Sequence, residues 1–378
     1  MKRIRQILFL LCMLLSVQQA GALLIENPPL DPNWIGNIDT SSPEGTDYWA
    51  AFMTHNGLLK NDPNLKLSIY AIADSPTTII IEVNGTVRGR IPLTADASGY
   101  VAEGVNRLTT TLVYLAATDV EKAMNCGVHI YSEDRKTPFS CYAFSEAGQG
   151  LQTTRASALL LPTHMLGTQY YVQTYQTDAN ATEFAVVATE NNTHITISSP
   201  IATSKTAKPD DGPVVFNQTL KKGQVFMVRS NPRDISIDGQ DINLSGSFVC
   251  ADRPVAVFQG NDYVKIVTEG TSAGTFSGNH VFNQTFPIEQ LGNEYYIGLT
   301  EHAKYNFYNI LATVDGTVVN VSGKAPLTMN AGDKIPSAYL LSATGDKFTK
   351  VTSNQPIMVT SYLSCGGING ETTETGAM

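Results

Sequence analysis

The stretch Leu166-Gly167-Thr168-Gln169-Tyr170-Tyr171-Val172 decides the fold, because similar motifs occur at two other places in the chain. An earlier copy reads Gly45-Thr46-Asp47-Tyr48-Trp49, and a later copy reads Leu291-Gly292-Asn293-Glu294-Tyr295-Tyr296-Ile297. The glycines of the three copies, at positions 45, 167 and 292, lie 122 and 125 residues apart. A nearly fixed period of this kind indicates that the chain repeats one structural unit.

Two further signatures follow the first one in the same order. The second is a strand, a tight turn and another strand, which we expect to form a β-hairpin or come close to one. The three strand pairs are 67–73 with 77–83, 184–189 with 194–198, and 310–314 with 317–321. In the last pair, Asp315-Gly316 is a two-residue turn that tolerates positive φ, the strongest local hairpin signal. The third signature is a polar turn that ends in Pro138, Pro254 or Pro356 and runs into an apolar strand, where the missing backbone donor costs little.

Together the signatures predict three β modules, over residues 45–165, 166–290 and the shorter 291–378. Many short strands between closely spaced turns favour sandwich-like modules, so we predict an all-β fold of tandem β-sandwich-like modules from an internal repeat of about 120 residues. The alternative is a propeller-like arrangement, but one propeller blade takes only about 40 to 50 residues. The only helix that we expect is a short one from Asp119 to Met124, with Asp119 as its cap.

The N-terminus reads as a secretory signal peptide over residues 1–22. Three basic residues precede an apolar run from Ile7 to Leu15, and the small residues Ala20-Gly21-Ala22 follow. The apolar run is shorter than the ~20 residues of a membrane-spanning helix, which disfavours a transmembrane anchor. We therefore expect residues 23–44 to be an N-terminal linker, and the mature protein to be secreted or exposed at the cell surface. In a bacterial host the periplasm is an alternative location.

The charge balance excludes some partners. Without the three basic residues of the leader, 22 Lys and Arg remain against 34 Asp and Glu, which gives a net charge of about −12. Nucleic acids and anionic lipids both reward a basic surface, so neither is an expected partner. Charged residues make up only 16% of the chain, below the roughly 25% of ordinary soluble proteins. Polarity without charge suits exposed strands and turns better than amphipathic helices.

Four cysteines remain after the leader, an even number that is compatible with two disulfides in an oxidising compartment: Cys126, Cys141, Cys250 and Cys365. If the polar turn 132–136 folds about the Glu133-Asp134 bond, Cys126 and Cys141 face each other across a hairpin, within the distance that a disulfide requires. The alternative is that both are reduced, buried small side chains. Cys250 and Cys365 are the second candidate pair, although no local feature supports it.

One literal catalytic motif occurs, Gly270-Thr271-Ser272-Ala273-Gly274, which matches the Gly-x-Ser-x-Gly nucleophile elbow. An elbow needs a strand before the serine, a helix after it, and then an acid and a histidine in that order. A poor helix former follows here, and the only later histidines are His280 and His302. A Gly/Ser/Thr loop is therefore favoured over a serine hydrolase that uses Ser272.

No other residues suggest chemistry. No two of the six histidines have metal-ligand spacing, so we predict no metal site and no cofactor; the histidines are His55, His129, His164, His194, His280 and His302. A calcium site between modules is the alternative. The paired aromatics of the first signature recur at matching positions, which favours a packing role over a ligand platform. Seven Asn-x-Ser/Thr sequons become glycans in a eukaryotic secretory pathway, at Asn84, Asn180, Asn191, Asn217, Asn243, Asn283 and Asn320.

Three segments carry a family resemblance: Pro138 to Phe144, Ser157 to Thr163, and Leu166 to Val172. They resemble the N-terminal domain of the IgGFc-binding protein family, and 45–53 is similar to the start of that domain. The resemblance extends from about residue 45 to the end and rests on structural positions, not on active-site residues. It implies adhesion or immunoglobulin binding, in a family that includes mucus-associated animal proteins and secreted or surface proteins of bacteria. The chain lacks the cysteine-rich modules that follow this domain in the animal proteins.

The leader, the repeat and the missing catalytic constellation together predict a non-catalytic binding or adhesion protein. Its expected partner is an extracellular protein or glycoconjugate, such as an immunoglobulin or a mucin-like molecule, engaged through loops at the ends of the β modules. The sequence does not identify the residues that bind this ligand. The alternative function is a structural scaffold of the cell envelope, in which the modules act as spacers.

Overall fold

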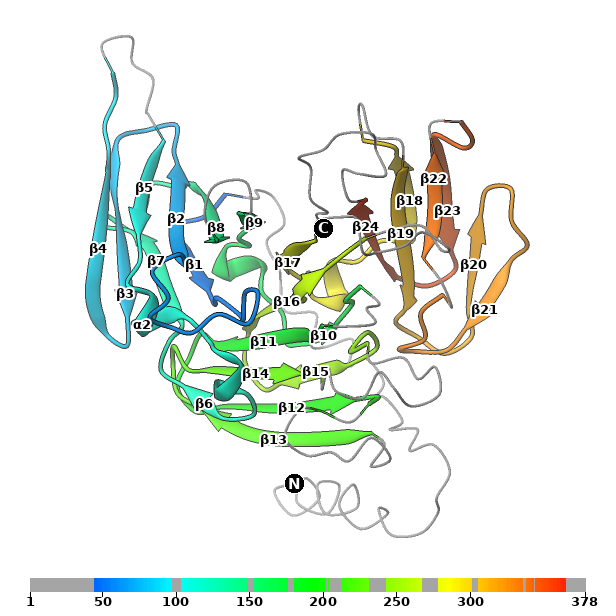
Figure 1. Ribbon diagram of the computed structural model, residues 1–378, viewed down its shortest axis with the longest axis horizontal. Helices are drawn as coiled ribbons and strands as arrows, with labels where there is room; N and C mark the ends of the chain where they lie inside the picture. The colour runs from blue at the N-terminus through cyan, green and yellow to red at the C-terminus, as the bar shows by residue number, and fades with distance from the viewer. Residues whose placement is uncertain are drawn as a thin grey trace, which may run out of the picture. The chain divides into compact units, whose positions relative to one another are not determined.

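The computed structural model describes residues 44–96, 103–148, 153–175, 180–201, 203, 213–230, 243–266, 278–300, 305–335, 338–342 and 344–364. Nearly all of their regular structure is antiparallel β-sheet (Figure 1). Four short helices make up the rest: α2 (Thr110–Val113), η1 (Ala117–Asp119), η3 (Thr163–Met165) and η7 (Ile288–Gln290). None of the described helices has the length and apolar character needed to cross a membrane. The predicted leader and linker lie outside these residues.

The first group of strands, called module 1 below, forms two four-stranded sheets. In order across the first sheet are β1 (Asp47–Ala50), β7 (Val128–Ser132), β3 (Thr77–Val83) and β4 (Thr86–Leu93). In order across the second sheet are β5 (Gly104–Arg107), β2 (Lys66–Ile72), β8 (Ser140–Ala147) and β9 (Thr154–Leu159). The inward faces of both sheets contribute to one buried apolar cluster, as in a β-sandwich.

The same strand order recurs twice. Module 2 has one sheet of β10 (Gln169–Tyr171), β15 (Phe248–Ala251), β12 (Thr193–Ser199) and β13 (Val214–Leu220), and another of β17 (Asn279–Gln284), β16 (Val255–Val264), β11 (Thr182–Ala188), β14 (Val225–Arg229) and β6 (Ala123–Met124). Module 3 has one sheet of β18 (Glu294–Gly298), β23 (Phe348–Ser353), β20 (Thr317–Val321) and β21 (Leu327–Met329), and another of β22 (Tyr339–Ser342), β19 (Tyr305–Ala312) and β24 (Ile357–Leu363). The predicted all-β fold of tandem sandwich-like modules is confirmed, while the exact domain boundaries stay a prediction.

The predicted hairpins of the second signature are wrong, although their strands exist. β2 and β3 belong to different sheets, and the same is true of β11 with β12 and of β19 with β20. The tight turn between each pair carries the chain from one sheet of the sandwich to the other, so the two strands pack face to face instead of pairing. Both strands are apolar on their inward faces, and burying these faces against each other accounts for this choice. A true hairpin links β3 to β4 through Asn84-Gly85, both with positive φ.

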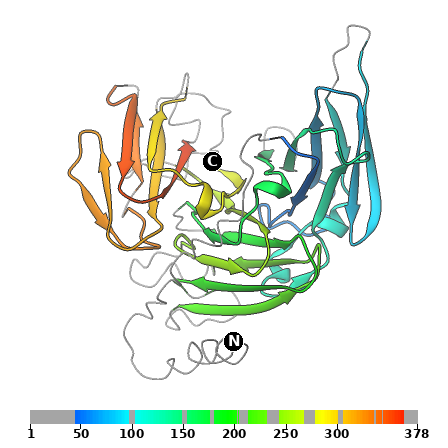
Figure 2. The same cartoon turned by 180° about the vertical axis from the view of Figure 1, so that it is seen from behind.

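The predicted helix from Asp119 to Met124 is also wrong. The chain makes only the short helix η1 up to Asp119 and then turns, with Glu121 at a φ of +56°, into β6. β6 pairs with β14, at Met124↔Val225 and Ala123↔Phe226, so it extends a sheet of module 2 (Figure 2). Pairing with a neighbouring sheet edge satisfies backbone groups that a helix would have satisfied internally, and tertiary context overrides the weak local preference.

The first signature has the same hydrogen bonds in every module. The tyrosine hydroxyl accepts a bond from the signature glycine and donates one to the carbonyl that follows the proline of the third signature. In module 2, the Gly167 amide lies 2.8 Å from the Tyr170 hydroxyl, which lies 2.6 Å from the Val255 carbonyl oxygen. The other two sets join Gly45, Tyr48 and Phe139, and Gly292, Tyr295 and Ile357. The tyrosine therefore ties the entrance of one sheet to the start of a strand in the other.

The second aromatic of the signature marks the contact between successive modules. It stands opposite the same register position each time, in the pairs Trp49↔His129, Tyr171↔Phe248 and Tyr296↔Lys350. Trp49 is 3% exposed and lies beside Gly223, in the turn before β14 of module 2. Tyr171 is 2% exposed and packs with residues of module 3. Tyr296 in module 3 is 65% exposed.

In modules 1 and 2, a glycine lies two residues before the residue that pairs with the second aromatic of the signature. This glycine lets the next module approach closely. The Gly127 amide lies 3.0 Å from the Gly223 carbonyl oxygen, and a Cβ on Gly127 would stand 2.7 Å from that oxygen. Likewise a Cβ on Gly246 would stand 2.5 Å from the Gly332 carbonyl oxygen. In module 3 the same position is Phe348, which is 66% exposed. This side chain excludes the same close approach of a further module.

Candidate functional site

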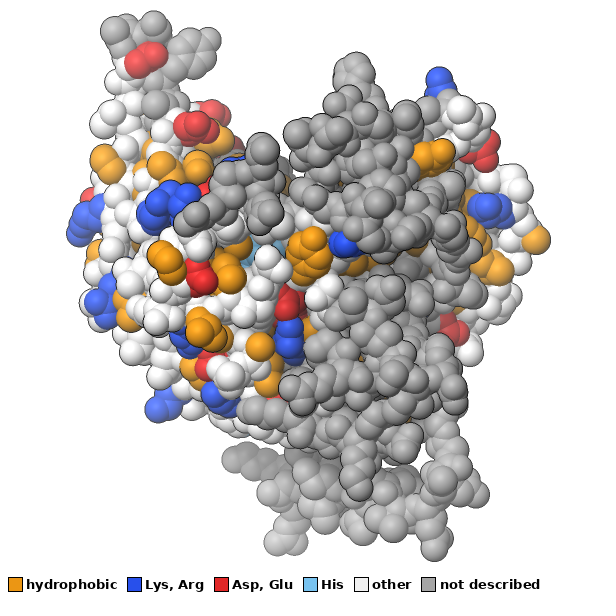
Figure 3. All heavy atoms as spheres, in the orientation of Figure 1, with side chains coloured by type: hydrophobic (Ala, Val, Ile, Leu, Met, Phe, Trp, Pro, Cys, Tyr) orange, Lys and Arg blue, Asp and Glu red, His pale blue; other side chains and the backbone are white. Residues whose placement is uncertain are grey.

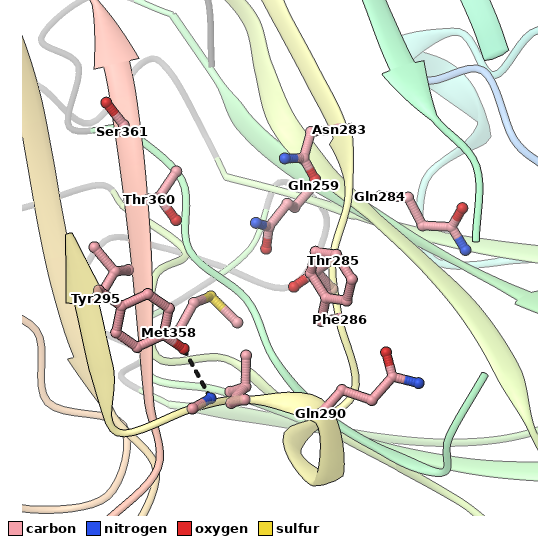
Figure 4. Close-up of a pocket in the computed structure, with 13 residues that line it drawn as sticks. Gln259, Asn283, Gln284, Thr285, Phe286, Gln290, Tyr295, Met358, Thr360 and Ser361 are labelled. Atoms are coloured by element: carbon pink, nitrogen blue, oxygen red, sulfur yellow. Dashed lines mark hydrogen bonds between the residues drawn. The ribbon is translucent and has the colours of Figure 1, made fainter. Parts of the chain in front are cut away.

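A groove of about 480 Å³ lies where β16 and β17 of module 2 meet β18 and β24 of module 3 (Figure 4). Module 2 lines it with Gln259, Asn283, Gln284, Thr285, Phe286 and Gln290. Module 3 lines it with Tyr295 and the run from Met358 to Ser361 on β24. The volume falls within the roughly 300–1,000 Å³ of small-ligand sites. Its walls come from four separate segments, so only the folded chain assembles it.

β24 has two different faces, and this explains how it lines the groove. Ile357 and Val359 point into the apolar cluster of module 3. Met358 packs with Tyr171 of module 2, and the Thr360 hydroxyl donates to Gln173 there. Because strand residues alternate between faces, one face completes a core while the other meets the neighbouring module. The groove opens beside this second face.

Amide side chains are fixed at the groove wall by one of their two ends. Gln259 Oε1 accepts a bond of 2.8 Å from the Gln173 amide, and Gln284 Oε1 accepts one of 2.8 Å from the Leu161 amide. Gln290 Nε2 donates to the Met165 carbonyl oxygen at 2.5 Å. Figure 4 shows Gln259 between Asn283 and Met358, and Gln290 on the side of the η7 turn. Anchoring of this kind holds an amide in place without using all of its bonding capacity.

The free ends of these amides are unusual. Asn283 Oδ1, Gln284 Nε2 and Gln290 Oε1 are buried and have no hydrogen-bond partner within the described part of the chain. A buried polar group without a partner costs about 1–3 kcal/mol, and most such groups in proteins are satisfied. None of these three atoms is exposed to solvent, and Gln284 and Gln290 point away from β24 toward Leu161 and Met165 (Figure 4), so the atoms do not face a ligand in the groove.

The groove is electrically neutral. Among its lining side chains only Tyr295 is ionisable, and burial raises the pKa of Tyr295 above its ordinary value, so it stays uncharged at neutral pH. The Tyr295 hydroxyl is already bonded to the Gly292 amide and the Ile357 carbonyl. On the face drawn in Figure 3, acidic and basic side chains of the described residues stand scattered among neutral ones. The groove therefore offers amides, hydroxyls and apolar surface to a ligand, but no charge.

Two other hollows fit a binding role less well. One of about 450 Å³ lies beside Trp49, but its Asp47 carboxylate is already paired, 2.7 Å from both His129 and Arg135, and its Lys222 ammonium lies over the Trp49 ring. The other, of about 190 Å³ beside His280, is smaller than ordinary small-ligand sites. The groove between modules 2 and 3 is therefore the favoured candidate.

A buried ionisable cluster lies where modules 1 and 2 meet. The rings of His55 and His280 stack with their centroids 4.2 Å apart. Nearby, Arg229 bridges two carboxylates: its guanidinium pairs with Asp262, and its Nε lies 3.5 Å from Glu183. Burial, reinforced by the charge of Asp262, raises the pKa of Glu183 well above its usual range.

The two histidines of this cluster are neutral at neutral pH. Burial lowers the pKa of His280 to about 4, and burial together with His280 lowers the pKa of His55 well below its usual range. His55 bonds Ser145 and Thr154 at 2.7 and 2.8 Å through its two ring nitrogens. All its polar atoms are thus engaged within the protein. The cluster contributes to the joint between the modules.

The lowered pKa values of these two histidines predict that the joint between modules 1 and 2 loses stability in acid. Between pH 6.5 and about 4 the unfolded chain binds protons at histidines that the folded chain excludes, so their contribution to stability is lost as the pH falls through this window. Glu183, with its raised pKa, acts in the opposite direction. We therefore expect the free energy of unfolding of His280→Gln, measured with urea, to fall by about 2–3 kcal/mol less than that of the wild type between pH 7 and pH 4. The exposed His194→Gln should keep the wild-type slope, and an equal slope in His280→Gln would contradict the assignment.

The cysteine prediction rested on a hairpin that the structure does not contain. Cys126 precedes β7, and Cys141 lies on β8, which belongs to the other sheet of module 1. Cys126 and Cys141 are buried free thiols, and Cys250 is a half-buried free thiol. Burial raises the pKa of Cys126 to about 12 and also raises that of Cys141, so both are protonated and unreactive at neutral pH. Cys365 lies outside the described residues.

Only some of the remaining sequence candidates lie among the described residues. Ser272 and the whole motif from Gly270 to Gly274 lie outside the described residues, as does His302. His55, His129 and His280 are buried, whereas His194 is exposed on β12. Within the part of the chain that the structure describes, no group of three or more His, Cys, Asp or Glu side chains is placed to hold a metal ion together.

Sequence reasoning missed both the groove and the buried cluster. The groove residues are spread from position 259 to 361 and share no motif. Two local signals were present, however: Gln259 follows the apolar run Val255–Phe258, and Glu183 opens the apolar run Phe184–Ala188. A buried polar residue beside an apolar run needs a partner, so each marks a place where another part of the fold must supply one.

The chain is similar in sequence to a known protein family and to one of its human members. The family model described as IgGFc binding protein matches residues 156–378, so the resemblance noted for 45–155 lies outside the matched range. The IgGFc-binding protein of Homo sapiens is 31% identical over 179 residues, which are 46% of this chain and 3% of the human protein. A solved structure, the GH78 family rhamnosidase of Bacillus sp. GL1, aligns with 84% of this chain and 53% of its own chain at 10% identity, with a TM-score of 0.15.

Proposed function

Because this chain belongs to the IgGFc-binding protein family, we propose that it is a non-catalytic binding protein, secreted or held at the cell surface, that recognises an extracellular protein or glycoconjugate. The groove between modules 2 and 3 is the proposed contact site. The family match over residues 156–378 is the observation that carries the proposal, and the groove adds an uncharged hollow of small-ligand size.

The sequence supports the proposed location outside the cell or at its surface. The basic start, apolar run and small residues of 1–22 are typical of a signal peptide. The acidic balance of the mature chain disfavours nucleic acid and anionic membranes as partners. A ligand on the outside of the cell is consistent with both features.

The absence of catalysis is part of the proposal. The ionisable cluster around His55, His280 and Glu183 is buried, and both ring nitrogens of His55 are bonded within the protein. The thiols of Cys126 and Cys141 are protonated. A fluorophosphonate probe should therefore leave Ser272 unlabelled, and labelling there would favour a serine hydrolase instead.

A ligand screen tests the binding function. The mature chain, immobilised through one terminus, is exposed to mucin, serum glycoproteins and Fc fragments, and retained molecules are identified by mass spectrometry. We expect at least one of them to be retained in a saturable manner. Retention of none would count against the binding function, whatever the role of the groove.

A further inference from the structure

We propose that the edge of β24 that faces away from β19, called the open edge below, is a docking site for an extended strand of a partner protein. The partner strand pairs with β24 and becomes the fourth strand of its sheet. This inference rests on the binding function proposed above and names the kind of partner and the way it binds. It is carried by the strands that cover the equivalent edges of modules 1 and 2, and by the groove that lies along this edge in module 3.

The second sheet of module 3 lacks, among the described residues, a strand that its two counterparts have. In module 1, β8 is flanked by β2 and β9, and in module 2, β16 is flanked by β11 and β17. The counterpart of β8 and β16 is β24, which follows the proline of the third signature in the same way but stands last in the order β22-β19-β24. A sheet edge with unpaired backbone groups is a ready template for another strand.

The backbone of β24 directs every second residue toward the open edge. In module 2 the carbonyl of Val257 on β16 accepts a bond of 2.9 Å from the Thr285 amide, directly after β17. Val257 and Val359 both stand three residues after the proline of the third signature, so they hold the same place in their strands. Because backbone groups alternate in direction along a strand, the amides and carbonyls of Val359, Ser361 and Leu363 point toward the open edge.

The groove lies in the place that a fourth strand of module 3 would take. In modules 1 and 2 the fourth strands β9 and β17 lie side by side: Asn279 on β17 bonds both the amide and the carbonyl of Arg155 on β9, at 2.9 and 2.6 Å. By the repeat, a fourth strand of module 3 stands between β17 and β24. Figure 4 shows the groove there, with Ser361 on β24 at one side and Asn283 on β17 at the other. Because β17 limits the space, a single strand fits it better than the sheet of a second copy of this chain.

The partner strand carries uncharged side chains at its centre. Among the described residues, no Lys, Arg, His, Asp or Glu side chain lines the groove, and burying a charge without a partner is costly. The residue opposite Ser361 corresponds to Ala158 on β9 and to Asn283 on β17, both uncharged. The sequence of residues 365–378 suits this place less well than a partner strand, because it contains four glycines and two glutamates, which are depleted in strands.

A peptide that copies β9 serves as the probe, because β9 is the fourth strand of module 1. The peptide of residues 154–161, with blocked ends and a fluorescent label, is titrated into the full mature chain, and anisotropy gives the dissociation constant. We expect saturable binding, and slower hydrogen exchange of the amides of Ser361 and Leu363 in the complex. The Ala158 amide faces the paired strand, as the Leu160 amide does in module 1. Ala158→Pro in the peptide should therefore weaken binding by at least about tenfold.

Two substitutions at one position separate backbone pairing from recognition of a side chain. Ser361→Pro removes an amide that faces the open edge, while the residues on either side of it keep their bonds to β19. Proline is tolerated on an edge strand in this orientation, and we expect this variant to bind the probe at least about tenfold more weakly. Ser361→Ala removes the exposed hydroxyl but keeps the amide, so it should bind within about twofold of the wild type. Equal melting temperatures show that both variants fold.

The outcomes separate this inference from the proposed function. A probe that binds the full chain, and loses affinity in Ser361→Pro but not in Ser361→Ala, supports docking at the open edge. Equal losses in the two variants, or no binding of the probe, would overturn it. Binding that appears only after removal of residues 366–378 would also overturn it, because the chain itself then covers the edge. If a protein retained in the ligand screen binds Ser361→Pro as tightly as the wild type, the edge inference fails while the binding function stands. If the screen retains nothing and the probe does not bind, both fail.

Discussion

Replacing Tyr170 by Phe should destabilise the protein by about 2–4 kcal/mol, although it removes a single oxygen atom. The Tyr170 hydroxyl is fully buried and serves two backbone groups, the Gly167 amide and the Val255 carbonyl. Phe keeps the ring but leaves both groups with one partner fewer in a place that water does not reach. Urea unfolding followed by fluorescence measures the loss.

The repeat supplies the matched control for this substitution. Tyr295 makes the same two bonds in module 3, but it is only half-buried and water can replace its hydroxyl. Tyr295→Phe should therefore cost only about 1 kcal/mol. Equal and small effects at positions 170 and 295 would mean that the hydroxyl bonds do not hold the sheets together.

Replacing Gly246 by Ala should cost about 2–5 kcal/mol, because it strains the backbone and pushes modules 2 and 3 apart. Gly246 has a φ of +88°, a conformation that costs an L-residue about 1–2 kcal/mol. Its new Cβ would stand 2.5 Å from the Gly332 carbonyl oxygen, which belongs to the backbone and cannot turn aside. Overpacking of this kind typically adds about 1–3 kcal/mol. The free energy of unfolding is again the quantity to measure.

The equivalent position in module 3 distinguishes docking from a general effect on the strand. Phe348 holds the register position of Gly246 but contacts no further module in the described chain and is exposed. Phe348→Ala should change stability by less than about 0.5 kcal/mol. If Gly246→Ala is equally harmless, the close contact between Gly246 and Gly332 does not hold the modules together.

The fold class could be predicted from the sequence because the repeated residues have local structural roles that few other residues can fill. Gly167 and Tyr170 recur because a hydroxyl must reach a backbone amide three residues away, and Pro254 recurs because it starts a strand beside that bond. These requirements are local, so they survive in the sequence as motifs at a fixed period. The strand pairing was predicted wrongly, because a tight turn such as Asp315-Gly316 suits a hairpin and a crossing between sheets equally well.

The candidate site could not be predicted in the same way. Gln259, Asn283 and Ser361 come from three strands, and nothing in their neighbours shows that β24 turns one face toward module 2. The role of Tyr296 also depended on context: it has the same place in its signature as Tyr171, yet it is exposed where Tyr171 is buried. Contacts between modules decide both cases, and a signature within one module does not encode them.

The most direct test of the account is a binding curve of the mature chain on an immobilised mucin-type glycoprotein, followed by release of the ligand and measurement of its mass. We expect saturable binding and a released ligand of unchanged mass, because the protein is proposed to bind without catalysis. No binding to any extracellular glycoprotein or Fc fragment, or a ligand released in cleaved form, would contradict it.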